Sequence, residues 1–252
     1  MKAAVVLLTL LALAVRFWEL ARPSIWVDEI STIAYSGVFN GMTLERVLIN
    51  LQGPFHALAL FVWTRLFGSG EVALRSLQAV AGAATVPVFW WALRPLGRPA
   101  VALTACLLLA VSPFHLWYSQ EVRNYVFAIL LGVAATGALV RRPQSARSWA
   151  RYTACNVLGL LSNLSQAFLL LTHGAWLVSG GRSTRRLWRG ALISLAITFL
   201  CLSPWLVQFW HRSVIPSGAL GTPPVTTLTS IRGETAAPLL GVPYAYYTFA
   251  AG

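Results

Sequence analysis

The chain has 252 residues, of which 57% are hydrophobic and only 10% charged. A soluble domain carries about 25% charged residues, so this composition excludes a single water-soluble globule and favours a protein with several membrane spans. The net charge of +12 comes from arginines between apolar runs and not from one basic face, which argues against a nucleic-acid partner.

Seven apolar segments predict an all-α fold, a polytopic transmembrane helical bundle. They are 3–20, 72–93, 99–116, 125–140, 152–164, 166–180 and 190–210. A helix needs about 20 residues to cross the bilayer core, so the two short segments are expected to form a hairpin that turns near Asn163–Gln166. The N-terminus also resembles a signal peptide, but the spans that follow favour an uncleaved first span.

The loop charges predict the orientation. With a cytoplasmic N-terminus, the loops 94–98, 141–151 and 181–189 are cytoplasmic, and they contain arginines and no acid. The opposite loops hold the acids Asp28, Glu29, Glu45, Glu121 and Glu234. This segregation follows the positive-inside rule, and we expect a multi-pass plasma-membrane protein whose active face is extracytoplasmic.

The first outer loop, 21–71, is expected to contain helices that lie in the membrane interface. Its segment Pro54–Phe67 is apolar but too short to span, and a crossing there would reverse the orientation of every later loop. We expect a transmembrane domain over 1–210. Residues 211–252 read as an extracytoplasmic loop and the start of a further span, as in a truncated chain.

Two polar segments on the predicted outer face could carry chemistry. In Trp26–Glu29, the adjacent carboxylates of Asp28 and Glu29 suit a general base or a metal ligand, although two solvated acids beside an interfacial tryptophan would look the same. In Trp117–Tyr125, Arg123 suits a clamp on phosphate, although a polar turn anchored by aromatic residues is the alternative.

Two further arginines have a less specific pattern. Arg75 opens the second span and either meets a lipid phosphate or extends toward the headgroups. Arg16 and Glu19 stand three residues apart and are expected to pair.

The chain resembles the bacterial branch of the protein O-mannosyltransferase and aminoarabinose-transferase family, glycosyltransferases of the GT-C superfamily. The resemblance rests on Asp28-Glu29, then Arg65–Gly68, Glu71–Arg75, Ser112–Tyr125 and Leu202–Leu206, in that order. The family's His-Pro-Pro-Leu segment corresponds here to Gln52–His56, without the leading histidine.

The resemblance implies that a sugar moves from a polyprenyl-phosphate donor to an acceptor glycan, lipid or protein on the extracytoplasmic face. It assigns catalysis to Asp28, Glu29 and Glu121. The substrate-binding candidates are Arg123, Arg75, Tyr118, Gln120 and His56. A divalent cation held by Asp28 and Glu121 remains open, as do two other functions: a transporter or flippase, and a non-catalytic protein that only binds lipid-linked sugar.

Overall fold

The computed structural model describes residues 1–39, 41–43 and 53–214, with the backbone alone for 209–214. The predicted outer acids Glu45 and Glu234 lie outside the described residues, as do most of 211–252. The chain divides into two compact units, Met1–Leu206 and Val207–Gly252.

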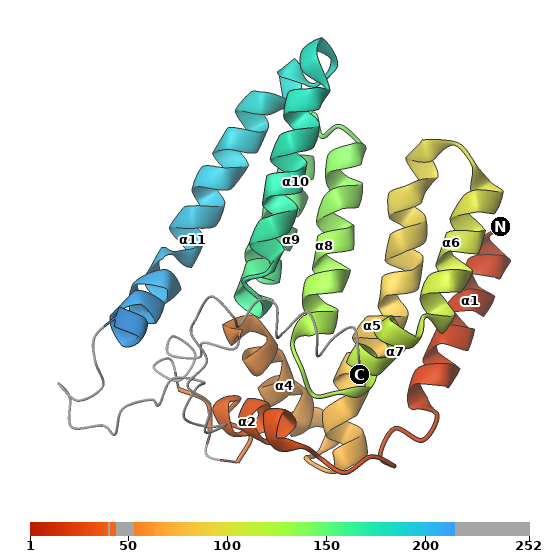
Figure 1. Ribbon diagram of the computed structural model, residues 1–252, viewed down its shortest axis with the longest axis vertical. Helices are drawn as coiled ribbons and strands as arrows, with labels where there is room; N and C mark the ends of the chain where they lie inside the picture. The colour runs from red at the N-terminus through yellow and green to blue at the C-terminus, as the bar shows by residue number, and fades with distance from the viewer. Residues whose placement is uncertain (40, 44–52, 215–252) are drawn as a thin grey trace, which may run out of the picture. The chain divides into compact units, whose positions relative to one another are not determined.

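The described part of the chain is helical, with no strand (Figure 1). Its α-helices are α1 (Lys2–Phe17), α2 (Val27–Tyr35), α4 (Pro54–Phe67), α5 (Glu71–Leu93), α6 (Pro99–Val111), α7 (Pro113–Gln120), α8 (Tyr125–Val140), α9 (Ala146–Ser162), α10 (Gln166–Ser179) and α11 (Trp188–Val214). Three 3₁₀ turns, Arg94–Leu96, Gly181–Ser183 and Arg185–Leu187, lie between them.

Each of the seven predicted spans contains a helix, but the count of seven spans is not supported. Among the described helices, only Glu71–Leu96 and Arg185–Gln208 are long and apolar enough to cross a membrane. The pair α6 and α7 adds a third span if it crosses as one broken helix, because it bends by 50° between Val111 and Pro113. The other predicted spans form helices of 14 to 17 residues, shorter than the roughly 20 that a bilayer requires.

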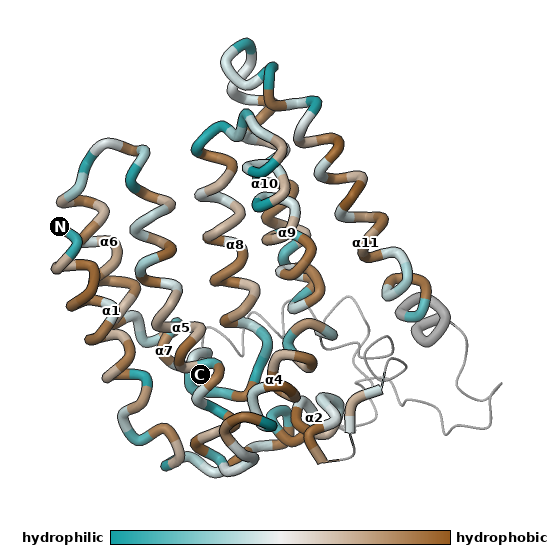
Figure 2. Tube along the Cα trace, turned by 180° about the vertical axis from the view of Figure 1, so that it is seen from behind, coloured by the Kyte–Doolittle hydropathy of each residue, from teal (hydrophilic) through white to brown (hydrophobic). Residues whose placement is uncertain are grey.

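Helix α5 lies at the centre of the first unit and packs against α1, α4, α6, α7 and α8. Small residues allow the helices to approach, as is usual in membrane bundles. A side chain at Gly82 would collide with Ser119 Oγ and Arg16 Nε, and one at Gly137 of α8 would meet the backbone of Ala92. The hydropathy of the trace follows this arrangement, with apolar helices ending in polar turns (Figure 2).

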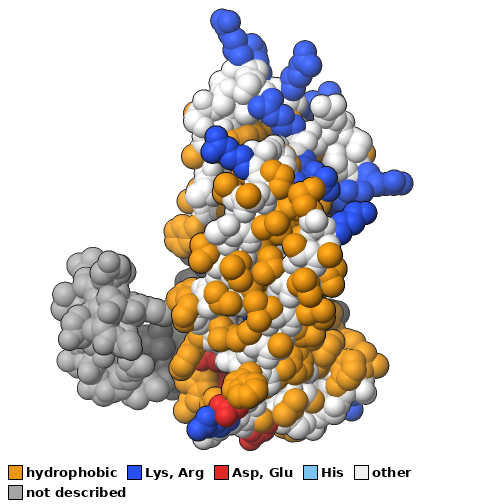
Figure 3. Space-filling view, turned by 90° about the vertical axis from the view of Figure 1, so that its right-hand side faces the viewer, with side chains coloured by type: hydrophobic (Ala, Val, Ile, Leu, Met, Phe, Trp, Pro, Cys, Tyr) orange, Lys and Arg blue, Asp and Glu red, His pale blue; other side chains and the backbone are white. Residues whose placement is uncertain are grey.

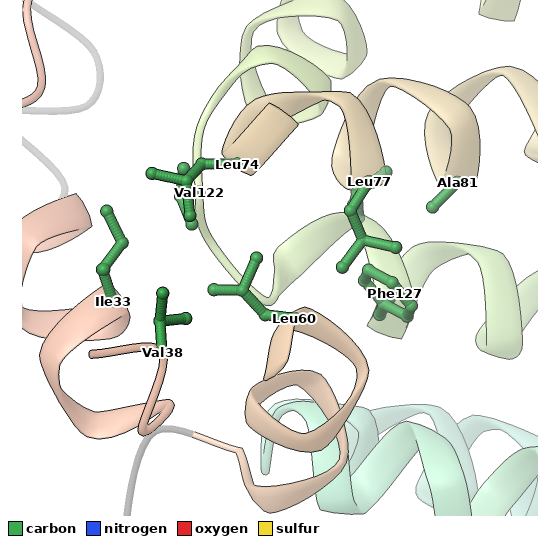
Figure 4. Close-up of a cluster of buried hydrophobic side chains, with 9 residues drawn as sticks. Ile33, Val38, Leu60, Leu74, Leu77, Ala81, Val122 and Phe127 are labelled. Carbon is green, nitrogen blue, oxygen red and sulfur yellow. The ribbon is translucent and has the colours of Figure 1, made fainter. Parts of the chain in front are cut away.

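The lower core holds the first loop against the bundle. Ile33 and Val38, from α2 and the turn after it, pack with Leu60 of α4 and with Leu74 and Leu77 of α5 (Figure 4). Val122 and Phe127, from the segment around the start of α8, complete this cluster. The helix predicted at 54–67 is present with those bounds, because Pro54 occupies its first turn and Gly68 follows its last residue.

Charged residues separate between the two ends of the unit. The arginine-rich turns after α5, α8 and α10 lie at the upper end of Figure 1, and α2 with α4 lies at the lower end. Figure 3 shows most arginine and lysine side chains at one end of the face it displays, acidic side chains with a few basic ones near the other end, and hydrophobic side chains between them. This is the distribution expected of a protein embedded in a membrane.

The predicted pair of Arg16 and Glu19 does not form. Helix α1 ends at Phe17, and Glu19 takes a left-handed backbone conformation with φ of 51°, so the helical spacing is lost. Glu19 instead pairs with Arg22 at 2.6 Å on the surface. Arg16 is buried and donates to the carbonyl oxygens of Ala12 and Ala110 and to His115 Nδ1.

Candidate functional site

The start of α2 and the turn between α7 and α8 are held together by direct hydrogen bonds. The Val122 amide donates to Glu29 Oε1 at 2.8 Å, although the two residues are 93 positions apart. Arg123 Nη1 donates to the backbone carbonyl of Asp28 at 3.2 Å. The two polar segments singled out in the sequence therefore form one surface.

Glu29 is fully buried and connects the segments that form this surface. Its carboxylate accepts from Arg75 Nε at 3.0 Å, from Arg75 Nη2 at 2.7 Å and from the Val122 amide. It also accepts from the Trp26 amide at 3.4 Å, which closes a capping box at the start of α2. A carboxylate with this many protein donors is occupied in holding α2, α5 and the α7–α8 turn together.

Arg75 is equally occupied. Besides its two contacts with Glu29, its guanidinium donates to the carbonyl oxygens of Leu20, Pro23 and Ser24. A guanidinium has five N–H donors, and here each has an acceptor, so none is left for a lipid phosphate. Arg75 was expected to contact a lipid phosphate or to extend to the headgroups. In the structure it instead forms a buried ion pair.

Asp28 is placed differently from its neighbour. Its side chain is 49% exposed, and its Oδ2 lies 3.7 Å from Arg123 Nη2, whose side chain is 15% exposed. Arg123 also donates to Thr32 Oγ1 and to the Tyr125 hydroxyl, both at 3.3 Å, and stacks over the Tyr125 ring. A partly accessible carboxylate thus lies beside a guanidinium whose orientation is fixed.

Arg123 also lines a pocket of about 230 Å³ at this end of the unit. The other lining residues are Gly53, Asn124, Tyr125, Asn163, Leu164 and Trp205. Gly53 has φ of 115°, and a Cβ there would collide with the carbonyl of Ser162, so only glycine allows α4 to begin this close to the α9–α10 turn. Asn124 fastens the same turn by donating to the Ser162 carbonyl at 2.5 Å.

Glu121 lies between these groups and is half-buried. Its pKa is raised above the ordinary value, chiefly because burial disfavours the charged carboxylate, and also because Glu29 and Asp28 repel it. A hydrogen bond from Trp117 and the charge of Arg123 act in the opposite direction. Neither Glu121 nor Asp28 is among the residues that line the pocket, so a shared cavity for the two carboxylates stays a prediction.

The remaining candidates mostly support the framework. Gln120 donates to the carbonyl oxygens of Arg16 and Trp18, which closes the end of α1. His56 is buried against Phe127, with its Nε2 2.8 Å from the side-chain amide of Gln78. Tyr118 makes edge contacts with the rings of Phe114 and Tyr125. Tyr118 thereby touches Tyr125, which lines the pocket.

Neither Gly53 nor Trp205 was predicted to belong to a site. Asn124 belongs to the polar segment Trp117–Tyr125, which was predicted to supply hydrogen-bond donors and acceptors. Trp205 comes from a predicted span, and nothing in the sequence shows that α11 reaches the α9–α10 turn.

Among the described residues, no group of three or more His, Cys, Asp or Glu side chains is arranged to hold a metal ion. Asp28 and Glu121 would supply two carboxylates. Mg²⁺ commonly binds one or two carboxylates together with substrate phosphates, so a cation held by these two side chains stays a prediction.

A sequence model of the dolichyl-phosphate-mannose-protein mannosyltransferase family matches residues 52–208, more than half of the chain. The chain belongs to this family. It is a mannosyltransferase-like glycosyltransferase of the GT-C type, and its apolar helices agree with a place in the membrane. Neither a curated protein nor a solved structure is significantly similar to it.

Proposed function

We propose that the chain transfers a sugar from a polyprenyl-phosphate donor to an acceptor hydroxyl on the extracytoplasmic side of the plasma membrane. The proposal rests mainly on one relationship, the partly exposed carboxylate of Asp28 lying 3.7 Å from the guanidinium of Arg123. Transfer from a lipid phosphate needs a proton acceptor for the incoming hydroxyl and a cation for the departing phosphate. These two side chains have those properties.

In this mechanism Asp28 orients the acceptor hydroxyl and takes its proton as the oxygen attacks the anomeric carbon. The bond between that carbon and the phosphate oxygen breaks, and the electron pair leaves with the lipid phosphate. Arg123 stabilises the phosphate as its charge rises, because a planar guanidinium matches two phosphate oxygens. The configuration at the anomeric carbon inverts, as in a single displacement.

Glu29 and Arg75 act in this proposal through position and not through contact with substrate. Their ion pair fixes the first turn of α2, and so fixes the backbone from which Asp28 projects. Glu121 borders the same surface. If the reaction uses a divalent cation, Asp28 and Glu121 would hold it, and it would offset the charge of the donor phosphate.

We propose further that α1, α8, α9 and α10 also cross the membrane, together with α5 and α11, although each is short. Helices α1 and α8 pack against α5, and α9 and α10 pack against α8; all four extend between the arginine-rich end and the end that carries α2 and α4 (Figure 1). The arginine-rich end would then be cytoplasmic. A transporter is less well supported, because the acids of the described helices lie at one end and not along the spans.

The direct test is an assay of sugar transfer. Membranes containing the chain would be supplied with polyprenyl-phosphate mannose, and with other polyprenyl-phosphate sugars, and the release of polyprenyl phosphate would be measured. Membranes without the chain are the control. The proposal predicts release that depends on the chain for at least one donor. If no lipid-linked sugar is consumed but the donor still binds, the chain is a binding protein and the catalytic proposal is wrong.

A further inference from the structure

A second concave surface lies between α9 and α11, away from the pocket lined by Arg123. It encloses about 660 Å³ and is lined by Ala146, Trp149, Ala150, Thr153, Ala154, Val157, Leu158, Gly190, Ile193, Ser194, Ile197 and Cys201. We call it the α9–α11 groove. Its volume falls within the ~300–1,000 Å³ typical of sites that bury a small ligand.

Small residues explain why the two helices leave a groove. Ala146, Ala150 and Ala154 follow one another on α9 at intervals of four, so they form one row of short side chains. Gly190 begins the facing row on α11 and lies against the Trp149 ring. At the floor, Thr153 Oγ1 donates to Ser194 Oγ at 2.8 Å, so the two hydroxyls are hydrogen-bonded to each other. The rest of the groove lining, which a ligand would contact, consists of hydrocarbon groups.

Three arginines are next in sequence to residues that line one end of the groove. Arg147 adjoins Ala146, Arg151 adjoins Ala150, and Arg189 adjoins Gly190. All three side chains are exposed. Within the described part of the chain, no hydrogen bond or ion pair involves any of their guanidinium groups. The adjacent stretches 141–151 and 181–189 contain no acid that could neutralise them.

The hydrocarbon surface and the cationic end together define the ligand. Helix α11 belongs to the candidate span Arg185–Gln208, of whose apolar window only 22% is buried. In a membrane, such an uncovered apolar surface contacts lipid. A molecule that places hydrocarbon along small apolar residues and an anionic group beside three guanidinium groups is an anionic phospholipid. Guanidinium groups pair with phosphate through two parallel hydrogen bonds, and basic pockets between membrane helices bind such headgroups.

We propose that the α9–α11 groove is a binding site for one anionic phospholipid, with an acyl chain along α9 and α11 and its headgroup among Arg147, Arg151 and Arg189. The arginine end of the groove lies at the opposite end of the unit from Asp28, and the site does not depend on the proposed transfer reaction. Bound lipid would tie α9 to α11, and α11 carries Trp205 to the pocket lined by Arg123.

The test uses the whole chain in neutral detergent and measures its thermal unfolding midpoint during titration with dioleoylphosphatidylglycerol. Dioleoylphosphatidylcholine, which has the same chains and no net charge, is the reference lipid. The proposal predicts a saturable rise in the midpoint with phosphatidylglycerol that phosphatidylcholine does not reproduce. Equal rises with both lipids would overturn it, because the headgroup would then have no specific site.

A charge-matched pair of variants separates a site from general attraction. The triple variant R147Q/R151Q/R189Q removes the arginines that border the groove, and R94Q/R98Q/R182Q removes three others from the same end. Each arginine near an anionic lipid is worth about fivefold in affinity, so the first variant should bind phosphatidylglycerol roughly a hundredfold more weakly. Equal weakening in both variants would show diffuse attraction and contradict the proposal.

A second pair of variants tests the hydrocarbon part of the site. Ala154→Trp places a large ring in the groove and should abolish the response to phosphatidylglycerol. Leu171→Trp adds the same ring to an exposed position on α10 and should leave the response intact. Both positions face outward, so both variants are expected to fold. An unchanged response in Ala154→Trp would rule out the groove as the place where the acyl chain binds.

Discussion

Arg75 Nη2 lies 2.7 Å from Glu29 Oε2, and both side chains are almost completely buried, at 3% and 0% exposure. The pair joins the second predicted span to the first turn of α2. Together with the Val122 amide, it determines where the backbone of Asp28 lies relative to Arg123. A buried ion pair therefore fixes the part of the backbone that carries Asp28.

The first prediction concerns this pair. Glu29→Gln leaves Arg75 charged and without a counter-ion in a buried position, which typically costs about 3–5 kcal/mol. We expect a large fall in the thermal unfolding midpoint in detergent. Glu19→Gln is the matched control, because its pair with Arg22 is exposed on both sides and such pairs contribute little. A fall no larger than that of the control would show that the pair does not hold the loop.

The second prediction concerns His56. Burial, reinforced by the charge of Arg123, lowers its pKa to about 3 from an ordinary 6.5. Because the folded-state pKa lies below the unfolded one, folding favours neutral His56. This contribution is complete above pH 6.5 and falls by about 1.4 kcal/mol per pH unit as the pH drops toward 3.

His56→Gln removes that titration. Stability of the variant should therefore decline less steeply than that of the wild type between pH 6.5 and 4.5, whatever its value at pH 7. Thermal unfolding measured across this range gives both slopes, and the comparison uses the slopes alone. Parallel curves would mean that His56 is not buried in its neutral form.

Local features of the fold were predictable from sequence, whereas the role of single charges was not. Pro54 and Gly68 delimit α4, and Asn163–Gln166 marks the turn between α9 and α10, because proline, glycine and asparagine act through their own backbone preferences. Arg75 could not be assigned in this way. An arginine at this position of the helix could extend to the lipid headgroups or form a buried ion pair. Only the identity of its partner, Glu29, distinguishes the two, and the sequence does not give it.

The candidate site likewise has features that the sequence predicts and features that depend on the tertiary structure. The positive-inside rule placed Asp28 and Glu121 on one face, but it gives no lateral distance, so it could not predict that Val122 bonds to Glu29. Trp205 illustrates the limit most clearly. Its side chain enters the pocket because α11 packs near the α9–α10 turn, and that packing is a property of the tertiary structure.

The third prediction concerns orientation. Gly70→Cys, at the end of the unit that carries α2 and α4, should react with a membrane-impermeant thiol reagent in intact cells. Gln144→Cys, in the arginine-rich turn after α8, should react only after the membrane is opened. Both positions are exposed, and a side chain at Gly70 meets nothing within 4 Å. The background would lack Cys106, Cys155 and Cys201. Labelling of both positions from the same side would refute the proposed orientation.

The fourth prediction concerns the donor phosphate. Arg123→Lys replaces a planar fork by a point charge and loses the separate contacts with Thr32 and Tyr125. We expect the KM for the lipid-linked donor to rise about tenfold or more, with the fold retained. Arg22→Lys, in the exposed surface pair, is the control and should leave KM unchanged. A KM for Arg123→Lys equal to that of the control would remove Arg123 from the donor site.

The last prediction concerns Asp28 and decides the chemistry. Asp28→Asn keeps the shape of the side chain and its hydrogen-bonding capacity but removes the charge and the proton acceptor. The side chain is about half exposed, so the thermal midpoint should stay near that of the wild type. If Asp28 is the general base, kcat for sugar transfer should fall by about 10²–10⁴-fold, while binding of the donor persists.

Ser31→Ala, one turn further along α2 and also on its accessible side, is the control for general disturbance of the helix. A wild-type kcat in Asp28→Asn would end the assignment of Asp28 as the base. The half-buried Glu121, whose pKa burial raises above its ordinary value, would then be the carboxylate to replace next.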